Sequence, residues 1–445
     1  MNPRVLPLLL TVCAVPLFAQ QTPQQIADAE LPSLVAIYKE LHAHPELSGK
    51  EEKTAAVIAK ELRALGLEVT EKVGKYKKPG ATSYGVVSVL KNGDGPTVLV
   101  RTDLDGLPVA EETGLPYASK DTQQNDEGKE VSTMHACGHD IHMSSFIGTA
   151  RALVKLKDHW KGTIVFVGQP AEEIGTGAKA LLADGLYTRF PKPDFVLGLH
   201  SSAALETGRI GVTEGYTFAN VDSVDVSVPG ISGHGAYPHK TKDPIVLAAQ
   251  MVNSWQTIAS REVNPLESMV VTVGSIHGGT KHNIISDEVK MQLTVRTYKK
   301  EVRDQILAAI ERIAKGCATT AGMPPDRMPV VHVRQDEFTP SAFNNPELTK
   351  RLLGVWRQTL GAENVETMDP VMAGEDFSEY SLPDHSVPAV IFWVGAIAPA
   401  KIAEARKTGA ELPSLHSSKY APVPEPTIRT GVIAMTAAVL DLMKK

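Results

Sequence analysis

Cysteine is scarce in this sequence, and several familiar catalytic signatures are missing from it. Only three of the 445 residues are cysteine, whereas exported proteins built on disulfides carry larger, even sets. The sequence has no H-E-x-x-H, no G-x-S-x-G and no G-x-x-x-x-G-K-[ST]. These absences argue against a helix-borne zinc protease site, a nucleophile-elbow serine hydrolase and a P-loop nucleotide site.

The charge balance also lacks the excess of one sign that marks nucleic-acid binding. Lys and Arg number 45 against 51 Asp and Glu, and no basic stripe interleaves with aromatic residues. Hydrophobic residues make up 42% and charged residues 22%, which is a globular composition. A chain of 445 residues is too long for one ordinary core, so we expect two domains.

Only one apolar run is long, and it lies at the N-terminus. Arg4 precedes a largely apolar segment from Val5 to Ala19, and a Gln-rich segment follows. This pattern predicts a signal peptide at residues 1–19, and therefore a periplasmic or secreted protein that is not attached to a membrane after cleavage. A membrane anchor, or a lipid anchor on Cys13, is the alternative.

Short β-like runs alternate with helical patterns over most of the chain. The β-like runs lie at 84–90, 97–101, 163–168, 195–199 and 389–394, and the helical patterns at 26–41, 51–65, 142–156, 178–186, 346–360 and about 425–443. This alternation predicts an α/β fold with a mixed, largely parallel sheet flanked by helices. A long loop of the kind that carries function is expected at 397–413.

A different pattern occupies about residues 219–337. It predicts strands at 221–228, 268–276, 288–297 and 329–336, with helices at 244–259 and 301–320. The order βαββαβ is the ferredoxin-like motif. Because α/β elements lie on both sides, we expect residues 219–337 to form a domain inserted into a larger one made of 23–218 and 338–445.

Metal-binding side chains follow three of the predicted strands. TVLVRTD ends at Asp103, TIVFVGQPAEE ends in Glu172 and Glu173, and FVLGLH ends at His200. Open α/β sheets bind ligands beyond the carboxyl ends of their strands, so we expect these side chains to meet at one edge.

The stretch MHACGHDIHM at 134 adds a thiol and an imidazole on a loop that enters the next helix. Cys137 and His139 are two residues apart, so in an extended loop both face the same way and can reach one ion. This pair suits zinc and other borderline metals. Taken alone, the spacing of Cys137 and His139 has a plainer explanation, which is that the two residues are neighbours by chance. Another alternative is a disulfide between Cys137 and Cys317.

The adjacent carboxylates of Glu172 and Glu173 repel each other and favour a nearby cation. One of them can bind a metal while the other faces the substrate as a general base. The alternative is a solvated helix N-terminus, where acidic side chains are stabilised by the helix dipole, since a helix is expected to begin near Gly177.

Nine motifs, taken in order, resemble a known family over nearly the whole mature chain. They are HAHPELSGKE at 42, RTDLDGLPV at 101, MHACGHDIHM at 134, QPAEEIGTGAKALLADGL at 169, GLHSS at 198, SGHGAYPH at 232, HNIISDE at 282, AGEDFSEY at 373 and LHSSKYAP at 415. The chain resembles the metal-dependent amidohydrolases that include aminoacylases, hippurate hydrolases, indole-acetyl-amino-acid hydrolases and carboxypeptidase G. The match is to their cysteine-ligand subfamily.

This resemblance implies a zinc-exopeptidase-like fold and two divalent ions per subunit, with zinc, manganese, cobalt and nickel all suited to the ligands. The ligands that it implies are Cys137, His139, Glu173, His200 and His416. It also implies Glu172 as the general base and Asp103 as a carboxylate that supports the ligands from behind.

The resemblance further implies that the inserted domain is a lid through which the protein forms a homodimer. His234 of the partner subunit would reach the active site, and Asn283 and Arg296 would hold the substrate. Each has a plainer alternative: His234 as a loop residue, Arg296 in a surface ion pair. The family usually has Pro after Asn-Val-Ile, whereas Ser286 stands there in this chain, so the role of Asn283 is open. Glu375 has no assigned role.

The predicted function is hydrolysis of N-acyl amino acids or similar small amides by a metal-activated water. The alternatives are an exported di-metal carboxypeptidase or dipeptidase of the same fold and a non-catalytic metal- or ligand-binding relative. A cysteine hydrolase with Cys137 as nucleophile is a further alternative, which chelators would leave active and alkylation would inactivate.

Overall fold

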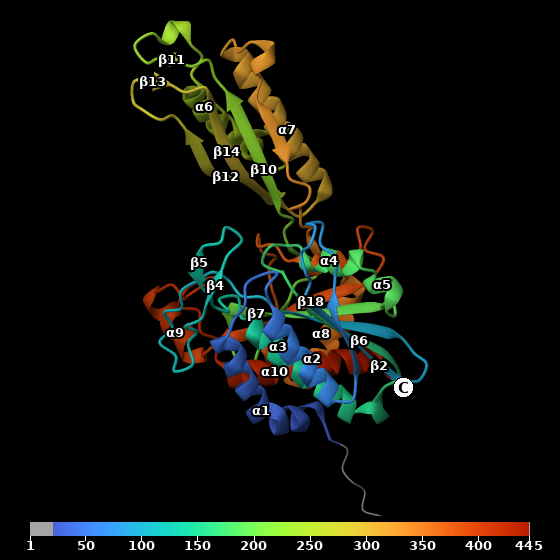
Figure 1. Cartoon of the computed structure of the whole chain (residues 1–445). Helices are drawn as coiled ribbons and strands as arrows, with labels where there is room; N and C mark the ends of the chain where they lie inside the picture. Colours follow the sequence, from blue (N-terminus) through green and yellow to red (C-terminus); the bar gives the residue numbers. More distant parts are fainter. Residues whose placement is uncertain (1–20, 445) are drawn as a thin grey trace, which may run out of the picture.

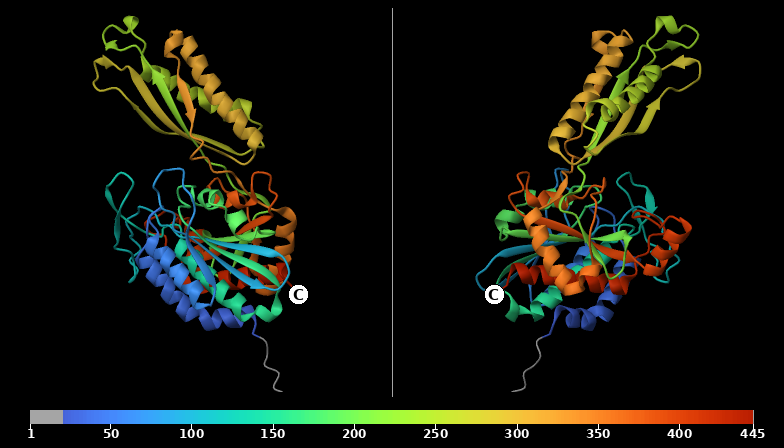
Figure 2. Two further views of the ribbon diagram at one scale, coloured as in Figure 1. Left: turned by 45° about the vertical axis from the view of Figure 1, so that its right-hand side comes forward. Right: turned by 180° about the vertical axis from the view of Figure 1, so that it is seen from behind.

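The structure, a computed structural model, describes residues 21–444. The predicted signal peptide, at residues 1–19, and Cys13 lie outside the described residues. Figure 1 shows a larger α/β domain with a second, elongated domain standing above it, and Figure 2 shows the same two bodies from other sides. Two chain crossings join them, one after residue 218 and one after residue 333.

An eight-stranded sheet forms the centre of the larger domain. In spatial order its strands are β1 (Glu68–Val73), β2 (Gly85–Asn92), β6 (Gly162–Gln169), β3 (Thr97–Asp103), β7 (Phe195–Glu206), β18 (Ala389–Ile397), β8 (Ile210–Val212) and β17 (Val365–Thr367). The central pairs β6–β3, β3–β7 and β7–β18 are parallel, as is β8–β17, while β1–β2, β2–β6 and β18–β8 are antiparallel. The predicted mixed, largely parallel sheet is confirmed.

Helices cover both faces of this sheet. One face carries α1 (Pro23–Ala43), α2 (Glu52–Ala64), α3 (His139–Lys155), α8 (Pro346–Leu360) and α10 (Pro424–Leu442), and the other carries α4 (Gly177–Ala183), α5 (Leu186–Arg189) and the 3-10 helix η6 (Asp376–Ser381). In β3, Val98 and Val100 enter the first core, whereas Leu99 enters the second. A strand buried on both faces has a continuous apolar sequence, and this is the signal that identified it.

The second body, here called the inserted domain (residues 222–333), is a four-stranded antiparallel sheet with two helices on one face. Its sheet order is β12 (Met269–Gly278), β14 (Glu288–Thr297), β10 (Asp222–Pro229) and β15 (Val330–Val333), and its helices are α6 (Pro244–Thr257) and α7 (Lys300–Thr320). Val224, Val226 and Val228 alternate with less buried residues along β10 and pack in the core beneath the helices. This alternation is the period-2 pattern of a strand with one buried face.

Short elements complete the chain. A small two-stranded antiparallel sheet of β11 (Gly233–His234) and β13 (Ile284–Ile285) lies at the outer end of the inserted domain (Figure 1). The other short pieces are β4 (Thr122–Gln124), β5 (Glu130–Ser132), β9 (Gly215–Phe218), β16 (Ala342–Asn344), η1 (Lys157–His159), η2 (Pro238–Lys240), η3 (Ile258–Glu262), η4 (Pro325–Arg327) and η5 (Ala362–Asn364).

Three local predictions were wrong. The expected loop at 397–413 contains a helix, α9 (Pro399–Thr408), in which only Ile402 is buried, so the sequence shows no apolar periodicity there. Helix α3 begins at His139 rather than at residue 142, and β7 continues past His200 to Glu206. His139 therefore lies on the first turn of a helix, and His200 lies within a strand.

Two expectations about the whole chain also have structural outcomes. Cys137 and Cys317 are both free, so the disulfide considered between them does not form. Between residues 21 and 444, every helix is too short or too polar to cross a membrane.

Candidate metal centre

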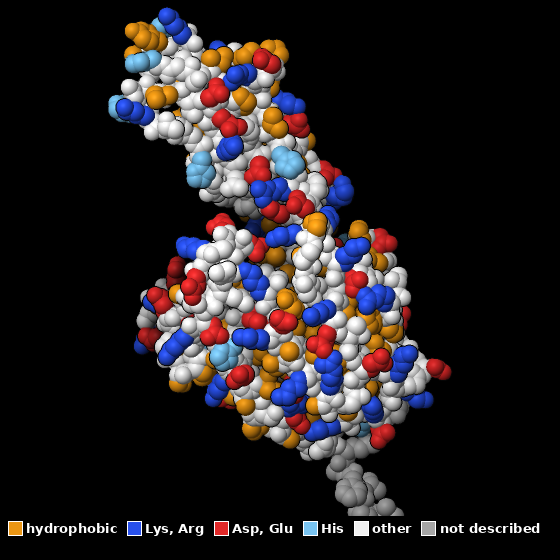
Figure 3. Space-filling view, viewed as in Figure 1, with side chains coloured by type: hydrophobic (Ala, Val, Ile, Leu, Met, Phe, Trp, Pro, Cys, Tyr) orange, Lys and Arg blue, Asp and Glu red, His pale blue; other side chains and the backbone are white. Residues whose placement is uncertain are grey.

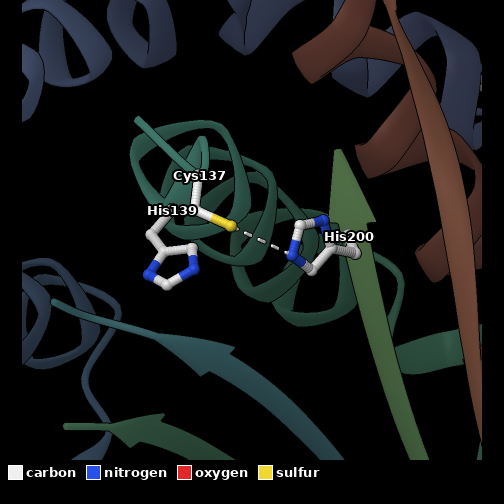
Figure 4. A group of neighbouring side chains, drawn as sticks. All are labelled: Cys137, His139 and His200. Atoms are coloured by element: carbon white, nitrogen blue, oxygen red, sulfur yellow. Dashed lines mark hydrogen bonds between the residues drawn. The ribbon is translucent and has the colours of Figure 1, made fainter. Parts of the chain in front are cut away.

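The five predicted ligands come together at one edge of the central sheet. Cys137 lies in the turn before α3, His139 begins α3, Glu173 follows β6, His200 lies in β7, and His416 precedes α10. Their potential ligand atoms form overlapping groups in which all atoms lie within 4.8 Å of one another: Cys137, His139 and His200; Cys137, Glu173 and His416; His139, Glu172 and Glu173. The predicted convergence at the ends of separate elements is therefore observed. Figure 4 shows the Cys137 thiol directed toward His200, with His139 beside it.

Two of the histidines have Nδ1 held by a backbone carbonyl, which turns Nε2 toward the other candidate ligands. His139 Nδ1 lies 2.7 Å from the carbonyl oxygen of Asp105, and His200 Nδ1 lies 2.8 Å from the carbonyl oxygen of Ser201. A carbonyl only accepts, so each Nδ1 carries the proton and each Nε2 presents a lone pair. Metal-ligating histidines are oriented by this kind of contact.

Buried polar atoms without a partner mark the centre of the cluster. Among the described residues, His139 Nε2 and Glu173 Oε1 are buried and make no hydrogen bond. They lie 3.7 Å from each other, too far for a hydrogen bond between them. Two such atoms facing each other at a site of mixed thiol, imidazole and carboxylate chemistry fit a cation placed between them.

The separations of the ligand atoms also fit a metal. Bonds of about 2.1 Å in a tetrahedral arrangement place neighbouring ligand atoms roughly 3.4 Å apart. Cys137 Sγ lies 3.5 Å from His200 Nε2, and His416 Nε2 lies 3.4 Å from Glu173 Oε2. The residues present therefore fit a divalent metal.

The loop that carries His416 is tied to the cysteine turn. The His416 backbone N–H donates to the carbonyl oxygen of Ala136 at 2.9 Å, next to Cys137. His416 has φ +66°, a left-handed conformation that is strained for a residue other than glycine. Strain of this kind at a candidate ligand is typical of a functional site.

Asp103 lies buried beside the cluster and binds two partners that the sequence reasoning missed. Its Oδ1 accepts from His142 Nδ1 at 2.7 Å, and its Oδ2 accepts from Arg101 at 2.8 Å. Burial alone would raise the pKa of Asp103, but His139, His142 and Arg101 hold it well below its usual range. The available signals were an arginine inside an apolar strand and a histidine three residues after His139, on the same helix face.

Arg101 also explains Glu375. The buried guanidinium of Arg101 donates to Glu375 Oε1 at 2.9 Å and to Asp376 Oδ1 at 3.3 Å. Glu172 lies beside this acidic pair, and its pKa is raised well above the usual range by burial and by the charges of Glu375 and Glu173. Glu375 thus belongs to the charged wall behind Glu172.

A cavity of about 670 Å³ opens onto the cluster. Its lining includes Glu172, the candidate ligands Cys137, Glu173, His200 and His416, and the aromatic side chains of Phe218 and Trp393. Arg296 also lines it, although it comes from β14 of the inserted domain, and its guanidinium donates to the carbonyl oxygen of Met372 at 3.0 Å. The predicted substrate-binding arginine therefore faces the same space as the metal cluster.

His234 and Asn283 are not brought to this cavity within one chain. His234 belongs to β11 and Asn283 directly precedes β13, so both lie at the outer end of the inserted domain, where both side chains are exposed. The Gly235 backbone N–H donates to the carbonyl oxygen of Asn283 at 2.8 Å, which holds the two segments together. Neither residue lines the cavity of its own subunit.

Comparison with known proteins gives consistent matches. The model of "Peptidase family M20/M25/M40" matches residues 99–411. The N-acetyl-L-cysteine deacetylase of Bacillus subtilis is 36% identical over 78% of this chain and 77% of its own length. Thermostable carboxypeptidase 1 of Saccharolobus solfataricus is 34% identical over 90% of this chain and 93% of its own length.

A solved structure agrees in fold. The crystal structure of the YXEP protein of Bacillus subtilis, described as a dinuclear metal binding peptidase from the M20 family, has a TM-score of 0.70 and 29% sequence identity. The match covers 93% of this chain and 98% of that one. The fold and the presence of divalent metal are thus supported by an independent structure.

Proposed function

The chain belongs to peptidase family M20/M25/M40 and is a metal-dependent amidohydrolase, and we propose that it hydrolyses the amide bond of small N-acyl amino acids. The observation that carries the proposal is a buried pair of unpartnered candidate ligand atoms, His139 Nε2 and Glu173 Oε1, beside a further carboxylate, Glu172. Glu172 and Glu173 both line the cavity. A site that only binds metal has no use for Glu172. A relative of comparable length is named for removing an acetyl group from an amino acid.

Two divalent ions per subunit would be held by the five ligands, because two of the ligand groups share only Cys137. Cys137, His139 and His200 form one group, and Cys137, Glu173 and His416 form the other. Zinc, manganese, cobalt and nickel all suit this mixture of ligands. When bound, such ions lower the pKa of water and polarise a carbonyl group.

Glu172 would serve as the general base. Its side chain lines the cavity, and its Oε2 lies 3.8 Å from His139 Nε2. Its carboxylate would accept a proton from the water that attacks the amide carbon and then return the proton to the leaving amine. Glu173, the next residue, would remain a ligand.

Arg296 would bind the carboxylate of the amino acid. It is half-buried and lines the cavity, and among residues 21–444 its guanidinium donates one hydrogen bond, to the carbonyl oxygen of Met372. A guanidinium has five N–H donors, so several remain for a carboxylate. Phe218 and Trp393 offer an apolar wall on the same cavity.

The inserted domain would act as a lid that pairs two subunits. Large exposed hydrophobic side chains concentrate there: Tyr237, Ile245, Val246, Leu266, Ile276, Ile284 and Val330 lie between residues 222 and 333, against Ile174 alone in the rest of the described chain. Figure 3 shows hydrophobic side chains and histidines together at the outer end of this domain. Such patches mark interaction sites. In a homodimer the partner's His234 and the partner's Asn283 would approach the cavity and assist the reaction.

Export would precede function. The N-terminal pattern of residues 1–19 supports a cleaved signal peptide and a periplasmic or secreted enzyme. Comparing the N-terminus of the mature protein with the sequence, after expression of the full chain, tests this directly. An intact Met1 in the exported fraction would contradict it.

The experiment that tests the function compares Glu172→Gln with the unaltered enzyme on a panel of N-acyl amino acids, dipeptides and C-terminal peptide substrates. We expect kcat to fall at least a thousandfold while the metal content is unchanged, because the side chain keeps its size but loses the basic oxygen. Retention of most of the rate would exclude Glu172 as the base. Preference for peptides over acyl amino acids would favour the carboxypeptidase or dipeptidase reading that the Saccharolobus solfataricus relative supports.

A further inference from the structure

The turn that carries Glu172 and Glu173 is held by its backbone. The N–H of Glu172 donates to Asp105 Oδ1 at 3.1 Å, and the N–H of Glu173 donates to Asp105 Oδ2 at 3.0 Å. The N–H of the preceding residue, Ala171, donates to Glu51 Oε1 at 2.8 Å. Three successive amides are therefore bound by two carboxylates that are fully buried.

The turn needs this support because its backbone is strained. Ala171 has φ +53°, a left-handed conformation that residues with a Cβ rarely adopt. Its carbonyl oxygen accepts from Gly177 at 3.1 Å, which closes the turn against the start of α4. Strained residues of this kind persist only when their surroundings fix them.

The same two acids connect the turn to other parts of the site. The carbonyl oxygen of Asp105 accepts from His139 Nδ1 at 2.7 Å, and Asp105 Oδ2 also accepts from Ser48 at 2.6 Å. Glu51 Oε1 accepts a second N–H, that of Gly49, at 2.7 Å. Asp105 thus orients one metal ligand through its backbone and the Glu172–Glu173 turn through its side chain.

We propose that Glu51 and Asp105 form a carboxylate clamp, a pair of positioning residues that fix the 171–173 turn so that Glu172 faces the cavity and Glu173 faces the other ligands. The clamp accounts for Glu51 of the motif HAHPELSGKE and Asp105 of the motif RTDLDGLPV, which none of the proposed catalytic steps uses. It rests on the proposed function for the role of Glu172, and deepens it. The rival is a buried polar pair that merely stabilises the fold.

Two nearly isosteric variants separate the clamp from that rival. Both oxygens of Asp105 accept backbone N–H groups, so in Asp105→Asn the new amide N–H₂ must face one of them, whichever way it is turned. Glu51 uses only Oε1, so Glu51→Gln keeps its acceptor. We expect Asp105→Asn to lower kcat at least a hundredfold with KM changed less than threefold, and Glu51→Gln to keep kcat within about threefold of the unaltered enzyme. Glu52→Gln, an exposed neighbour, is the control.

The two roles are distinguished by the visible spectrum of the Co²⁺-loaded protein, because its bands respond directly to thiolate and carboxylate coordination. A purely structural role of the two acids would leave this spectrum unchanged. We expect Asp105→Asn to shift or weaken the bands, and both Glu51→Gln and Glu52→Gln to leave them in place. An unaltered spectrum with kcat within threefold in Asp105→Asn would overturn the clamp. Equal damage from Glu51→Gln and Asp105→Asn would overturn it as well, because charge and not hydrogen-bond direction would then matter.

If Asp105→Asn fails to fold, a second pair of variants, Glu51→Ala with and without Ala171→Gly, tests the clamp. Glu51→Ala removes the acceptor for the Ala171 N–H, and we expect it to distort the Co²⁺ spectrum. Adding Ala171→Gly, which makes the left-handed conformation accessible without strain, should restore the bands at least in part. No restoration would count against the clamp. The spectra are recorded without substrate, so they remain decisive even if none of the amides is hydrolysed and the proposed function fails.

Discussion

Two buried histidines, His42 and His139, both lie among carboxylates, but they differ in how many of their ring nitrogens have a hydrogen-bond partner. His42 Nδ1 lies 2.6 Å from Asp140 Oδ2, and its Nε2 lies 3.0 Å from Glu111 Oε1, so both ring nitrogens are paired. His139 pairs Nδ1 with a carbonyl and leaves Nε2 without a partner. Asp140 and His139 are adjacent in the chain, yet they serve different clusters. We call His42, Asp140 and Glu111 the closed cluster, which joins α1 to α3. We call the candidate metal ligands around His139 the open cluster, which faces the cavity.

The difference shows how a buried polar cluster can be read. A buried network in which every polar atom is paired rigidifies the fold, whereas buried ligand atoms that face one another without partners indicate an ion-binding site. A missing partner is not sufficient by itself: both ring nitrogens of His135 are buried and unpaired, but His135 belongs to none of the potential ligand groups between residues 21 and 444. Convergence with other ligands is the second requirement.

The largest effect is expected at the open cluster. His139→Ala removes a proposed ligand, so we expect metal content to fall by at least half and turnover by at least a thousandfold. In the unaltered enzyme a chelator should also lower the midpoint of thermal unfolding, because a bound ion stabilises the folded state, and this response should shrink in the variant. Elemental analysis with thermal scans measures both. Full metal content in His139→Ala would contradict the claim that the open cluster binds the metal.

At the closed cluster the effect should appear in stability instead. His42→Ala leaves two buried carboxylates without their partner, and we expect a loss of about 3–5 kcal/mol in the free energy of unfolding, with metal content per folded protein unchanged. Denaturant unfolding measures it. The control is His44→Ala, since the half-exposed pair of His44 and Asp121 should contribute only about 0.5 kcal/mol. A loss no larger than in this control would contradict the distinction.

The smallest effect is a pH dependence of the closed cluster. Burial alone would lower the pKa of His42, but the hydrogen bonds that it donates to the carboxylates of Asp140 and Glu111 outweigh burial and raise the pKa to about 10. Because the folded-state pKa lies above the ordinary value, the stabilisation is complete below about pH 6.5 and is lost as the pH rises toward 10. The stability difference between the unaltered enzyme and His42→Gln should therefore shrink over that range. A difference that is constant from pH 6.5 to 10 would exclude a charged His42.

Sequence reasoning was strongest where a pattern is local. The continuous apolar run of β3 and the alternation in β10 identified both sheets, and the ends of β3 and β6 placed Asp103 and Glu173 at one edge. It failed at α9, where a surface helix with a single buried residue has no periodicity to detect. The start of helix α3 at His139 was missed because its first turn carries polar side chains, among them a candidate ligand, rather than an apolar stripe.

Partners that depend on tertiary contact could not be read from the chain. Arg101 and Glu375 are 274 residues apart, and Glu51 and Ala171 are 120 apart, so no local pattern links them. The motifs named these residues, but only the fold shows which backbone N–H each carboxylate binds. His234 and Asn283 illustrate the remaining gap, because their proposed roles require a second subunit.

Anomalous diffraction from crystals grown with Zn²⁺ or Mn²⁺ tests the central idea most directly, because it locates ions independently of any assay. We predict peaks within bonding distance of Cys137 Sγ, of the Nε2 atoms of His139 and His200, and of the Glu173 carboxylate, with His416 completing the group. A map without a peak among these atoms at saturating metal, from protein that still hydrolyses amides in chelator, would contradict the metal centre.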